Sequence, residues 1–364
     1  MAPIVTYRTA SGDERIAAIV EIEYQHNNNK VPARYFVIHK DQEAREAVWV
    51  SAADVISKGT STQFDEVLSQ FMYHKGTNFE TVHFGRSSLR PWYFSPYPGI
   101  CPSPNLYVCP FCFAFTQEQS AYELHRKCCV QTFPPGEEIW RSTQKSQTFS
   151  IFEIDGSISK NYCQNLCLFT RLYLEHKEVS QETDVFLFYV LCVHDAYRCR
   201  PVGFFSKERS DSPNILSCIL CFPHFQKKGY GHLLIDAAYG MNIVALRPGG
   251  PEEPLSDFGK VSFMSYWSYR IFRYIAEHDS EEINVHDIRQ ATGISLNHIV
   301  ATLLHHKVIG LSSDGEYVAA RGERLCNLCD KALIKASRVF DFMKDPNYFS
   351  PVSIKEIIFV NKNV

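Results

Sequence analysis

A segment of 24 residues, YVCPFCFAFTQEQSAYELHRKCCV (107–130), combines four cysteines with one histidine. Thiolate sulfur and imidazole nitrogen are the usual ligands of tetrahedral structural zinc, and a C-x2-C pair directs two sulfurs at one point. The later residues have helical character, which would place His125 and Cys129 on one helix face and Cys128 off it. The alternative is a set of scattered buried thiols. The pattern C-x2-C-x12-H-x3-C predicts a closed, structural Zn²⁺ site with the ligands Cys109, Cys112, His125 and Cys129.

A second stretch with a chemical signature is QKKGYGHLLI (226–235), which follows an apolar run and opens a predicted helix. Gly229 and Gly231 would let the backbone approach an anion, and N–H groups at a helix start face such an anion with the positive end of the helix dipole. Lys227 and Lys228 add positive charge. Many strand-to-helix turns contain two glycines for geometry alone, so the turn predicts a phosphate site only together with its surroundings.

Composition narrows the class of protein. The 364 residues carry a formal net charge of -3, from 37 basic and 40 acidic residues, so overall charge does not indicate nucleic-acid binding. The longest apolar run, 185–193, is too short to span a bilayer and predicts a buried strand. The N-terminus does not resemble a secretory signal, so the 13 cysteines are expected to be thiols or metal ligands. No basic run resembles a nuclear import signal.

Hydrophobic periodicity predicts the elements that must position these residues. Strands are predicted at 34–40, 47–51, 149–156, 185–193, 201–208 and 215–222. Helices are predicted within 161–179, within 231–241 and after Ser256, and residues 283–310 indicate a helix, a turn and a second helix. Internal repeats and low-complexity segments are absent from the sequence. The arrangement predicts a mixture of strands and helices, with the glycine turn between a buried strand and a helix.

The flanks of the cysteine segment extend its pattern. RPWYFSPYP (90–98) precedes it and FPPGEEIWR (133–141) follows it. Together these segments resemble the start of the catalytic domain of the MYST family of histone acetyltransferases, which carries WYFSPYP, a C2HC finger and a PPG-x-EI-[YW]-R segment in this order. Further motifs in the family's order extend the resemblance over about residues 78–345.

The resemblance implies an α+β fold. The expected architecture is an acetyltransferase (GNAT-like) core with an N-terminal C2HC zinc-finger subdomain and a C-terminal winged-helix-like segment, preceded by a small β domain. Residues 1–60 are similar to a chromo-barrel or tudor-like domain, 61–77 would be a linker, and 78–364 the acetyltransferase domain. Within that domain the finger would occupy about 105–131, the acetyl-CoA core about 149–260 and the helix-turn-helix-like part about 261–345. In the small domain, Tyr35, Phe36 and Trp49 are expected to be core, with a methyl-lysine cage as the alternative.

The glycine turn resembles the family's acetyl-CoA motif Q-[RK]-x-G-x-G-[KR], which binds the CoA pyrophosphate. His232 stands where the family has a basic residue. SCILCFP (217–223) resembles the family's ACILTLP strand, whose backbone would pair with the pantetheine arm. The implied cofactor-binding set is Ile219, Leu220, Cys221, Gln226, Lys227, Lys228, Gly229, Tyr230, Gly231, His232 and Ser256.

GGPEEPLSDFG (249–259) resembles the family's G-x-PEKPLSDLG, and this register selects Glu252 as the general base. A base is needed because a lysine amine has a reference pKa near 10.4, and a carboxylate in a partly apolar cleft can accept its proton. Cys218 occupies the family's active-site cysteine position, so direct attack by lysine and a relay through acetyl-Cys218 both stay open. Ser256 would lie near the leaving sulfur or cap the next helix. LYLEHKEV (172–179) resembles LFLDHKTL, which makes Lys177 the expected autoacetylation site.

The resemblance implies a nuclear enzyme that acetylates histone tails and nucleosomes, the histone-four tail above all. It also implies a multisubunit complex, weak DNA contact and no membrane association. The alternative is a catalytically weakened, zinc-containing chromatin-binding module. His232 and the divergent stretch at 236–248 favour that alternative, whereas Gln226, Gly229, Gly231 and Glu252 favour catalysis.

Overall fold

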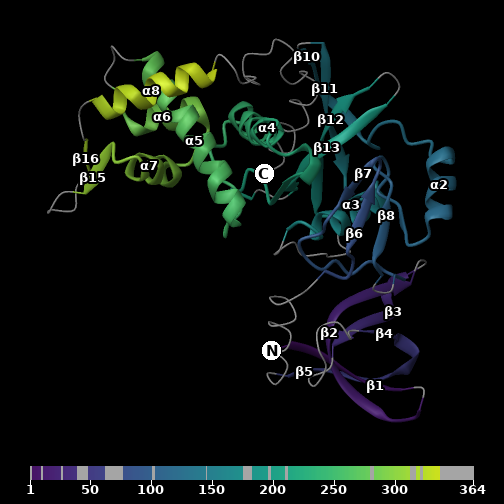
Figure 1. The fold of residues 1–364 in the computed structure, drawn as a ribbon. Coiled ribbons are helices and arrows are strands. Elements are labelled where there is room, and N and C mark those ends of the chain that lie inside the picture. The colour runs from purple at the N-terminus through teal and green to yellow at the C-terminus, as the bar shows by residue number, and fades with distance from the viewer. Residues whose placement is uncertain are drawn as a thin grey trace, which may run out of the picture. The chain divides into compact units, whose positions relative to one another are not determined.

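The computed structural model describes most of the chain, and its helices and strands are drawn in Figure 1. The described residues are 2–9, 11–25, 28–38, 48–61, 77–100, 103–144, 146–174, 183–195, 198–209, 212–278, 283–311, 317–319 and 323–336. One compact unit comprises Met1–Cys109, Phe113–Cys129 and Gln164–Gln181, and the other Pro110–Cys112, Val130–Cys163 and Glu182–Val364. None of the described helices has the length and apolarity that crossing a bilayer requires.

The first unit begins with a five-stranded antiparallel sheet in the order β4-β3-β2-β1-β5. Its strands are β1 (Ala2–Arg8), β2 (Glu14–Gln25), β3 (Asn28–Ile38), β4 (Val48–Ser51) and β5 (Val55–Ser61). β3 and β4 overlap the two strands predicted from the sequence. Tyr35 is 1% exposed and packs with Val5 and Val37, so it belongs to the core as expected. The side chains of Phe36 and Trp49, and residues 62–76 of the expected linker, lie outside the described residues.

The finger region of the first unit contains a small sheet in the order β7-β6-β8-β9. Its elements are β6 (Thr81–Phe84), β7 (Ser87–Leu89), β8 (Asn105–Val108), β9 (Phe115–Thr116) and helix α2 (Gln119–Cys128). The stacked rings of Phe84 and Phe169, with centroids 4.5 Å apart, contribute to its core. The buried Ser95 hydroxyl donates to the carbonyl of Leu168 over 2.7 Å, which fixes the WYFSPYP segment.

The second unit is organised around an antiparallel sheet in the order β10-β11-β12-β13-β14. The strands are β10 (Glu137–Gln144), β11 (Gln147–Asp155), β12 (Phe186–His194), β13 (Cys199–Glu208) and β14 (Cys218–Cys221). Helix α4 (Tyr230–Val244) packs against β13 and β14 through apolar side chains such as Leu234. β14 is shorter than the predicted strand 215–222, because residues 214–216 bond to the loop at 250–252 instead.

Helix α3 (Lys160–Arg171) occupies the first part of the stretch 161–179, in which a helix was predicted. Residues 172 and 173 form a turn, and the rest of the predicted helix, with Lys177, lies outside the described residues. The apolar spacing persists beyond the end of the helix, so periodicity alone could not locate that end.

The C-terminal part of the second unit is helical. It comprises α5 (Asp257–Glu277), α6 (Val285–Thr292), α7 (Leu296–His305), β15 (Ile309–Leu311), β16 (Tyr317–Ala319) and α8 (Glu323–Ala336). A capping box of Asn284 and Asp287 starts α6, and Gly293, with a φ of 69°, ends it in the left-handed conformation that glycine favours. The predicted helix-turn-helix is therefore confirmed, and the β15–β16 hairpin completes a winged-helix-like arrangement.

A buried polar network joins α4 to α5. The Tyr266 hydroxyl donates to Asp236 Oδ1 over 2.7 Å, and Arg270 lies 3.7 Å from the same oxygen. Trp267 Nε1 donates to the Tyr239 hydroxyl over 2.7 Å. Because buried charges are stable only when they are paired and hydrogen-bonded, these contacts fix the two helices in one register.

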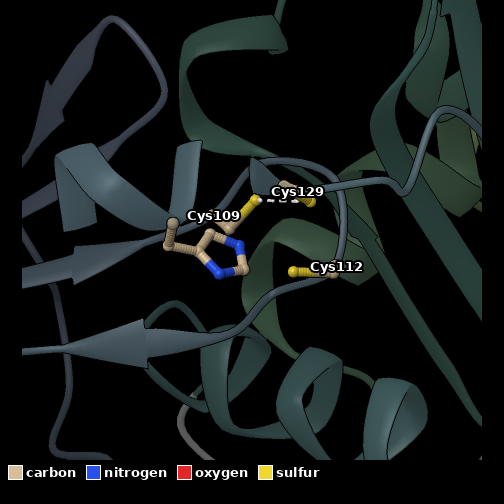
Figure 2. Close-up of side chains that lie close together, drawn as sticks. Cys109, Cys112 and Cys129 are labelled. Carbon is tan, nitrogen blue, oxygen red and sulfur yellow. Dashed lines mark hydrogen bonds between the residues drawn. The ribbon is translucent and has the colours of Figure 1, made fainter. Parts of the chain in front are cut away.

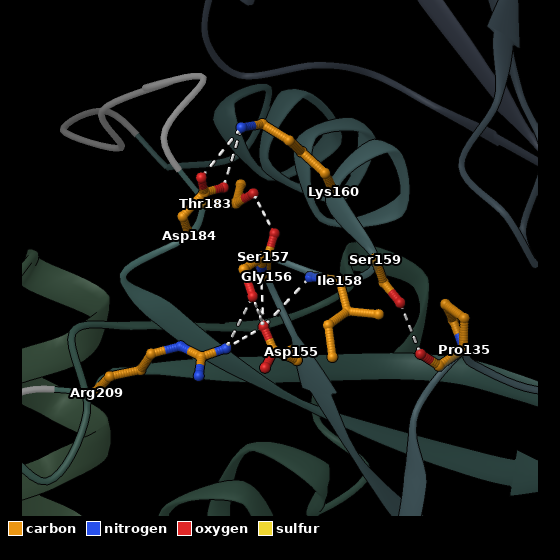
Figure 3. A network of polar contacts seen from close by, with 10 residues as sticks. All are labelled: Pro135, Asp155, Gly156, Ser157, Ile158, Ser159, Lys160, Thr183, Asp184 and Arg209. Atoms are coloured by element: carbon orange, nitrogen blue, oxygen red, sulfur yellow. Dashed lines mark hydrogen bonds and ion pairs between the residues drawn. The ribbon is translucent and has the colours of Figure 1, made fainter. Parts of the chain in front are cut away.

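A second polar network holds the turn after β11 (Figure 3). Arg209 forms an ion pair with Asp155, and the Ser157 amide donates to Asp155 Oδ1 over 2.8 Å. The Thr183 hydroxyl donates to the carbonyl of Gly156 over 2.7 Å. A Cβ at Gly156 would lie 2.0 Å from the Thr183 carbonyl oxygen, so glycine is required there. The network therefore holds the turn after β11 against Thr183 and Arg209.

The Asp155 network predicts a pH-dependent stability term. Burial alone would raise the pKa of Asp155, but hydrogen bonds from Arg209 and Ser157 outweigh it and lower the pKa to about 2. A depressed carboxyl pKa contributes stability that is present above the pKa of the unfolded state and is lost as pH falls toward the folded value. Asp155→Asn should therefore lower the free energy of unfolding at pH 7 by on the order of 2 kcal/mol, measured by urea denaturation.

The difference between wild type and Asp155→Asn should shrink between about pH 5 and pH 2, where the wild-type carboxylate becomes protonated. Asp257→Asn is the control, because the Asp257 side chain is 99% exposed and should add little at any pH. A difference that stays constant over this pH range would contradict the prediction.

Candidate functional site

The predicted zinc ligands converge in the structure. One ligand atom from each of Cys109, Cys112, His125 and Cys129 lies within 4.8 Å of the others, and the sulfurs of Cys109 and Cys129 are 3.9 Å apart (Figure 2). Two sulfurs bound tetrahedrally at 2.3 Å from zinc would be separated by about 3.8 Å. The fourth cysteine of the segment, Cys128, is exposed and lies outside the cluster. The residues therefore fit a structural zinc site of the predicted composition.

Local backbone geometry positions these ligands. Phe113 adopts a left-handed φ of 59°, which turns the chain sharply after the C-x2-C pair. The Phe113 amide donates to the Cys109 carbonyl over 3.0 Å and closes the knuckle. At the other end, His125 lies in the last turn of α2, and the amide of Cys129, the C-cap of that helix, donates to the His125 carbonyl over 2.7 Å. Cys109 is buried and the other three ligands are half-buried, which suits a closed site without an open coordination position.

Removal of one ligand should unfold the finger region, because metal binding is coupled to folding in such sites. Purified wild-type protein should contain about one zinc per chain by elemental analysis, and Cys109→Ser should lose the metal together with a large drop in thermal stability. Cys128→Ser is the matched control, since this neighbouring thiol is exposed and lies outside the cluster. Full zinc content in Cys109→Ser, or metal loss in Cys128→Ser, would contradict the assigned ligand set.

The glycine turn has the backbone geometry of an anion site. Lys227 and Gly229 have left-handed φ values of 61° and 89°, and α4 begins directly after Gly229. Alternating backbone conformations of this kind direct successive N–H groups toward one side, where they can bind an anion. A Cβ at Gly229 or at Gly231 would meet no atom within 4 Å. Side chains or a ligand could therefore be placed beside Gly229 and Gly231 without a collision at the Cβ positions, and phosphate binding at this helix start stays a prediction.

The basic side chains around this turn differ in exposure and in charge. Lys227 and Lys228 are exposed, and Lys228 Nζ lies 5.3 Å from the centre of the Phe225 ring. Burial, together with the charges of Lys228 and Arg200, lowers the pKa of His224 to about 4. His224 is therefore neutral at neutral pH, and the positive charge of the turn comes from the lysines.

His232 lies on the α5 side of α4. Its ring centroid is 5.1 Å from that of Tyr266 and 5.2 Å from that of Tyr269. The residue that replaces the family's basic side chain therefore packs against α5, and a phosphate contact by His232 stays a prediction.

Strand β14 carries Cys218 through Cys221 at the end of the sheet order. Cys218 is half-buried and pairs with Ser206 of β13. Burial raises the pKa of the Cys221 thiol to about 12, and its sulfur lies 3.7 Å from the Val202 carbonyl. Cys221 is therefore a packed thiol at neutral pH. Among the described strands only β13 pairs with β14, so β14 is the last strand in the order of this sheet.

The loop with the two acids lies against the chain that leads into β14. The Ile215 amide donates to the Gly250 carbonyl over 2.8 Å, and the Glu252 amide donates to the Leu216 carbonyl over 3.0 Å. A Cβ at Gly249 would lie 2.4 Å from the Pro213 carbonyl oxygen, which explains the glycine. The Glu252 side chain is exposed, and its backbone bonds to Leu216, which precedes Cys218 by two positions. The structure therefore places the loop of Glu252 beside residues 215 and 216, which lead into β14.

Ser256 is the N-cap of α5, and its hydroxyl accepts a hydrogen bond from the Gly259 amide over 3.1 Å. The capping interpretation is confirmed, and a role beside the leaving sulfur stays a prediction. Lys177 lies outside the described residues.

Two side-chain contacts in this region were not predicted from the sequence. Glu253 Oε1 lies 3.1 Å from His298 Nε2, and Lys207 Nζ donates to Asn242 Oδ1 over 2.7 Å. Burial, followed by the charge of Arg247, lowers the pKa of Lys207 to about 8. Both contacts join residues more than 30 positions apart in the chain, and no local pattern marks such pairs.

Known proteins resemble the chain over this region. It is 42% identical over 232 residues to the histone acetyltransferase Tip60 homolog of Caenorhabditis elegans, which covers 62% of this chain and 50% of that protein. It is 37% identical over 275 residues to histone acetyltransferase KAT6B of Homo sapiens, covering 75% of this chain and 13% of that protein. Histone acetyltransferase KAT6A of Homo sapiens is 38% identical over 246 residues, 67% of this chain and 12% of that protein. The chain thus spans half or less of each of these relatives.

Two family models match consecutive parts of the chain. Residues 77–129 match the MYST family zinc finger domain, which includes all four metal ligands. Residues 133–343, more than half of the chain, match the MOZ/SAS family and include the glycine turn, β14 and the loop of Glu252. With a MYST zinc finger directly before this region, the chain belongs to the MOZ/SAS family.

Proposed function

We propose that this chain is a protein-lysine N-acetyltransferase that moves an acetyl group from acetyl-CoA to lysine ε-amines of histone tails. The observation that carries the proposal is a convergence of three features in the second unit. These are the glycine turn before α4, the position of β14 as the last strand of its sheet and the exposed Glu252 on a loop bonded to Leu216. The names of the relatives, all histone acetyltransferases, support the same reaction class.

The cofactor would lie along β14 and end at the start of α4. The pyrophosphate of CoA would accept hydrogen bonds from backbone N–H groups of residues 229–231, with Lys227 and Lys228 adding charge. The pantetheine arm carries amide groups and is extended, so it can pair with the edge of β14 away from β13, at Ile219 and Leu220, as an added strand would. The Gln226 side chain donates to the Cys221 carbonyl over 3.1 Å, which ties the turn to the end of the strand.

Glu252 would act as general base. A lysine ammonium gives up a proton to the carboxylate, and the neutral nitrogen attacks the thioester carbonyl carbon. The carbon–sulfur bond then breaks, the CoA thiolate leaves and takes up a proton, and one proton is released overall. Cys218 would only pack in this direct route, whereas in a relay its sulfur would first form an acetyl thioester.

The remaining proposals concern the setting of the enzyme. Histone tails and nucleosomes, the histone-four tail above all, are the proposed substrates, because the relatives are histone acetyltransferases. We place the protein in the nucleus and in a multisubunit complex, with weak DNA contact. Residues 1–60 would act as a chromo-barrel-like domain, and Lys177 would be autoacetylated.

Gly231→Glu should abolish acetyl-CoA binding. The position has open space for a Cβ and ordinary helical backbone, so folding should survive, while the new carboxylate would occupy the anion site. Calorimetry should find the affinity reduced by more than about tenfold, or 1.4 kcal/mol. Gly310→Glu is the matched control, because Gly310 also has open space and lies in β15. Unchanged affinity in Gly231→Glu would place the cofactor elsewhere.

Glu252→Gln should keep the shape and the acetyl-CoA affinity but lower turnover on core histones by about 10²–10⁴-fold, the range for a positioned general base. The loss should shrink as pH rises, because more of the substrate lysine is then already neutral. Cys218→Ala should largely keep its activity in direct transfer and lose it in a relay. Radiolabelled acetyl transfer across pH 6–9.5 decides both points. A fully active Glu252→Gln refutes the base, and a folded but inactive Cys218→Ala refutes direct attack.

A further inference from the structure

We propose that His298 of α7 is a positioning residue for acetyl transfer. It holds Glu253, and through Glu253 it fixes the loop that presents Glu252. The inference rests on the proposed function, since it assigns Glu252 a role in catalysis. It concerns a contact between the helix-turn-helix part and the catalytic loop, both within the second unit.

The His298 ring is held on both nitrogens. Nε2 lies 3.1 Å from Glu253 Oε1, and Nδ1 lies 2.8 Å from the Ser295 hydroxyl. A carboxylate accepts only, so Nε2 must carry a proton, and Nδ1 can accept from Ser295 in the neutral ring. The hydrogen bond to Glu253 therefore does not require a positive charge on the histidine. The His298 side chain is 14% exposed and that of Glu253 is 67% exposed, so the histidine is the fixed partner.

The faces of the same ring are also confined. The Trp267 ring stacks on His298 with centroids 4.1 Å apart and an interplanar angle of 18°. Trp267 is itself fixed by its hydrogen bond to Tyr239 of α4. A Cβ at Gly250 would lie 2.2 Å from Cε1 of His298, so the ring contacts the backbone of the loop directly. Trp267 and the Gly250 backbone therefore both contact the ring that bonds to Glu253.

The loop between these contacts has backbone bonds on both sides. The Gly249 amide donates to the Gly293 carbonyl, and the Ser295 amide donates to the Gly249 carbonyl, each over 2.9 Å. The Glu252 amide bonds to Leu216, but the side chain of Glu252 is exposed. Glu253 is thus the side chain that anchors the loop to α7, and its neighbour Glu252 is left for the substrate. This division of roles explains why two adjacent acids stand here.

Two substitutions separate the hydrogen bond from the packing. His298→Leu keeps an apolar side chain against Trp267 but removes the donor to Glu253. His298→Gln keeps a donor near the position of Nε2. We expect kcat to fall about tenfold in His298→Leu and in Glu253→Ala, with an unchanged KM for acetyl-CoA, and to stay within about twofold of wild type in His298→Gln. Because the two residues act as one contact, the double variant should be no slower than the slower single variant. Asp257→Ala, another exposed acid close by in sequence, is the control with unchanged kcat.

Hydrogen–deuterium exchange supplies a readout that needs no catalysis. The backbone amides of residues 249–253 should exchange faster in His298→Leu and Glu253→Ala than in wild type and His298→Gln. Wild-type protein without acetyl transfer would refute the proposed function, and the exchange data would still decide whether His298 holds the loop. Unchanged protection in both variants, or additive losses of kcat in the double variant, would overturn the inference. Glu253 is exposed, so its variant tests the contact even if His298→Leu folds poorly.

Discussion

The backbone of residues 249–252 is bonded on two sides, and the arrangement of the second unit depends on these bonds. On one side Gly250 and Glu252 bond to Ile215 and Leu216, and on the other Gly249 bonds to the turn between α6 and α7. Side chains at both glycines would collide with neighbouring atoms, so only glycine allows the two neighbours to approach from opposite sides. The sheet, the loop of Glu252 and the helix-turn-helix part thereby share one short stretch of chain.

The finger region is stabilised in a different way, by metal ligands as well as by a core. It has four short strands and the ten-residue helix α2, and its apolar core includes Val82, Phe84 and Leu106. Four ligands on a tight knuckle and a helix end supply a cross-link that does not depend on such a core. The buried aromatic residues of the same unit, among them Phe84 and Phe113, then pack around a fixed point. The metal ligands and the rings therefore stabilise the same part of the chain.

The accuracy of prediction from the sequence followed the range of the interactions involved. The zinc ligands, the glycine turn, the Ser256 cap and the helix-turn-helix part all depend on residues close together in the chain, and each was predicted. The length of β14 was misjudged, because residues 214–216 bond to the loop at 250–252, and α3 ends where the Leu172 carbonyl accepts hydrogen bonds from the Trp92 and Tyr93 amides. The partner of Glu253 lies 45 residues away on α7. No spacing rule reaches that far, so the structure was needed to find it.

The position of β14 as the last described strand of its sheet has a consequence for aggregation. An unpaired strand edge offers N–H and C=O groups to any extended segment, including the same strand of another molecule, and proteins protect such edges with charge or a cover. Residues Cys218 to Cys221 have no charged side chain, and Leu220 between them is buried. A ligand laid along this edge would therefore also shield it from aggregation, and concentrated stocks of the empty protein should be the ones that precipitate.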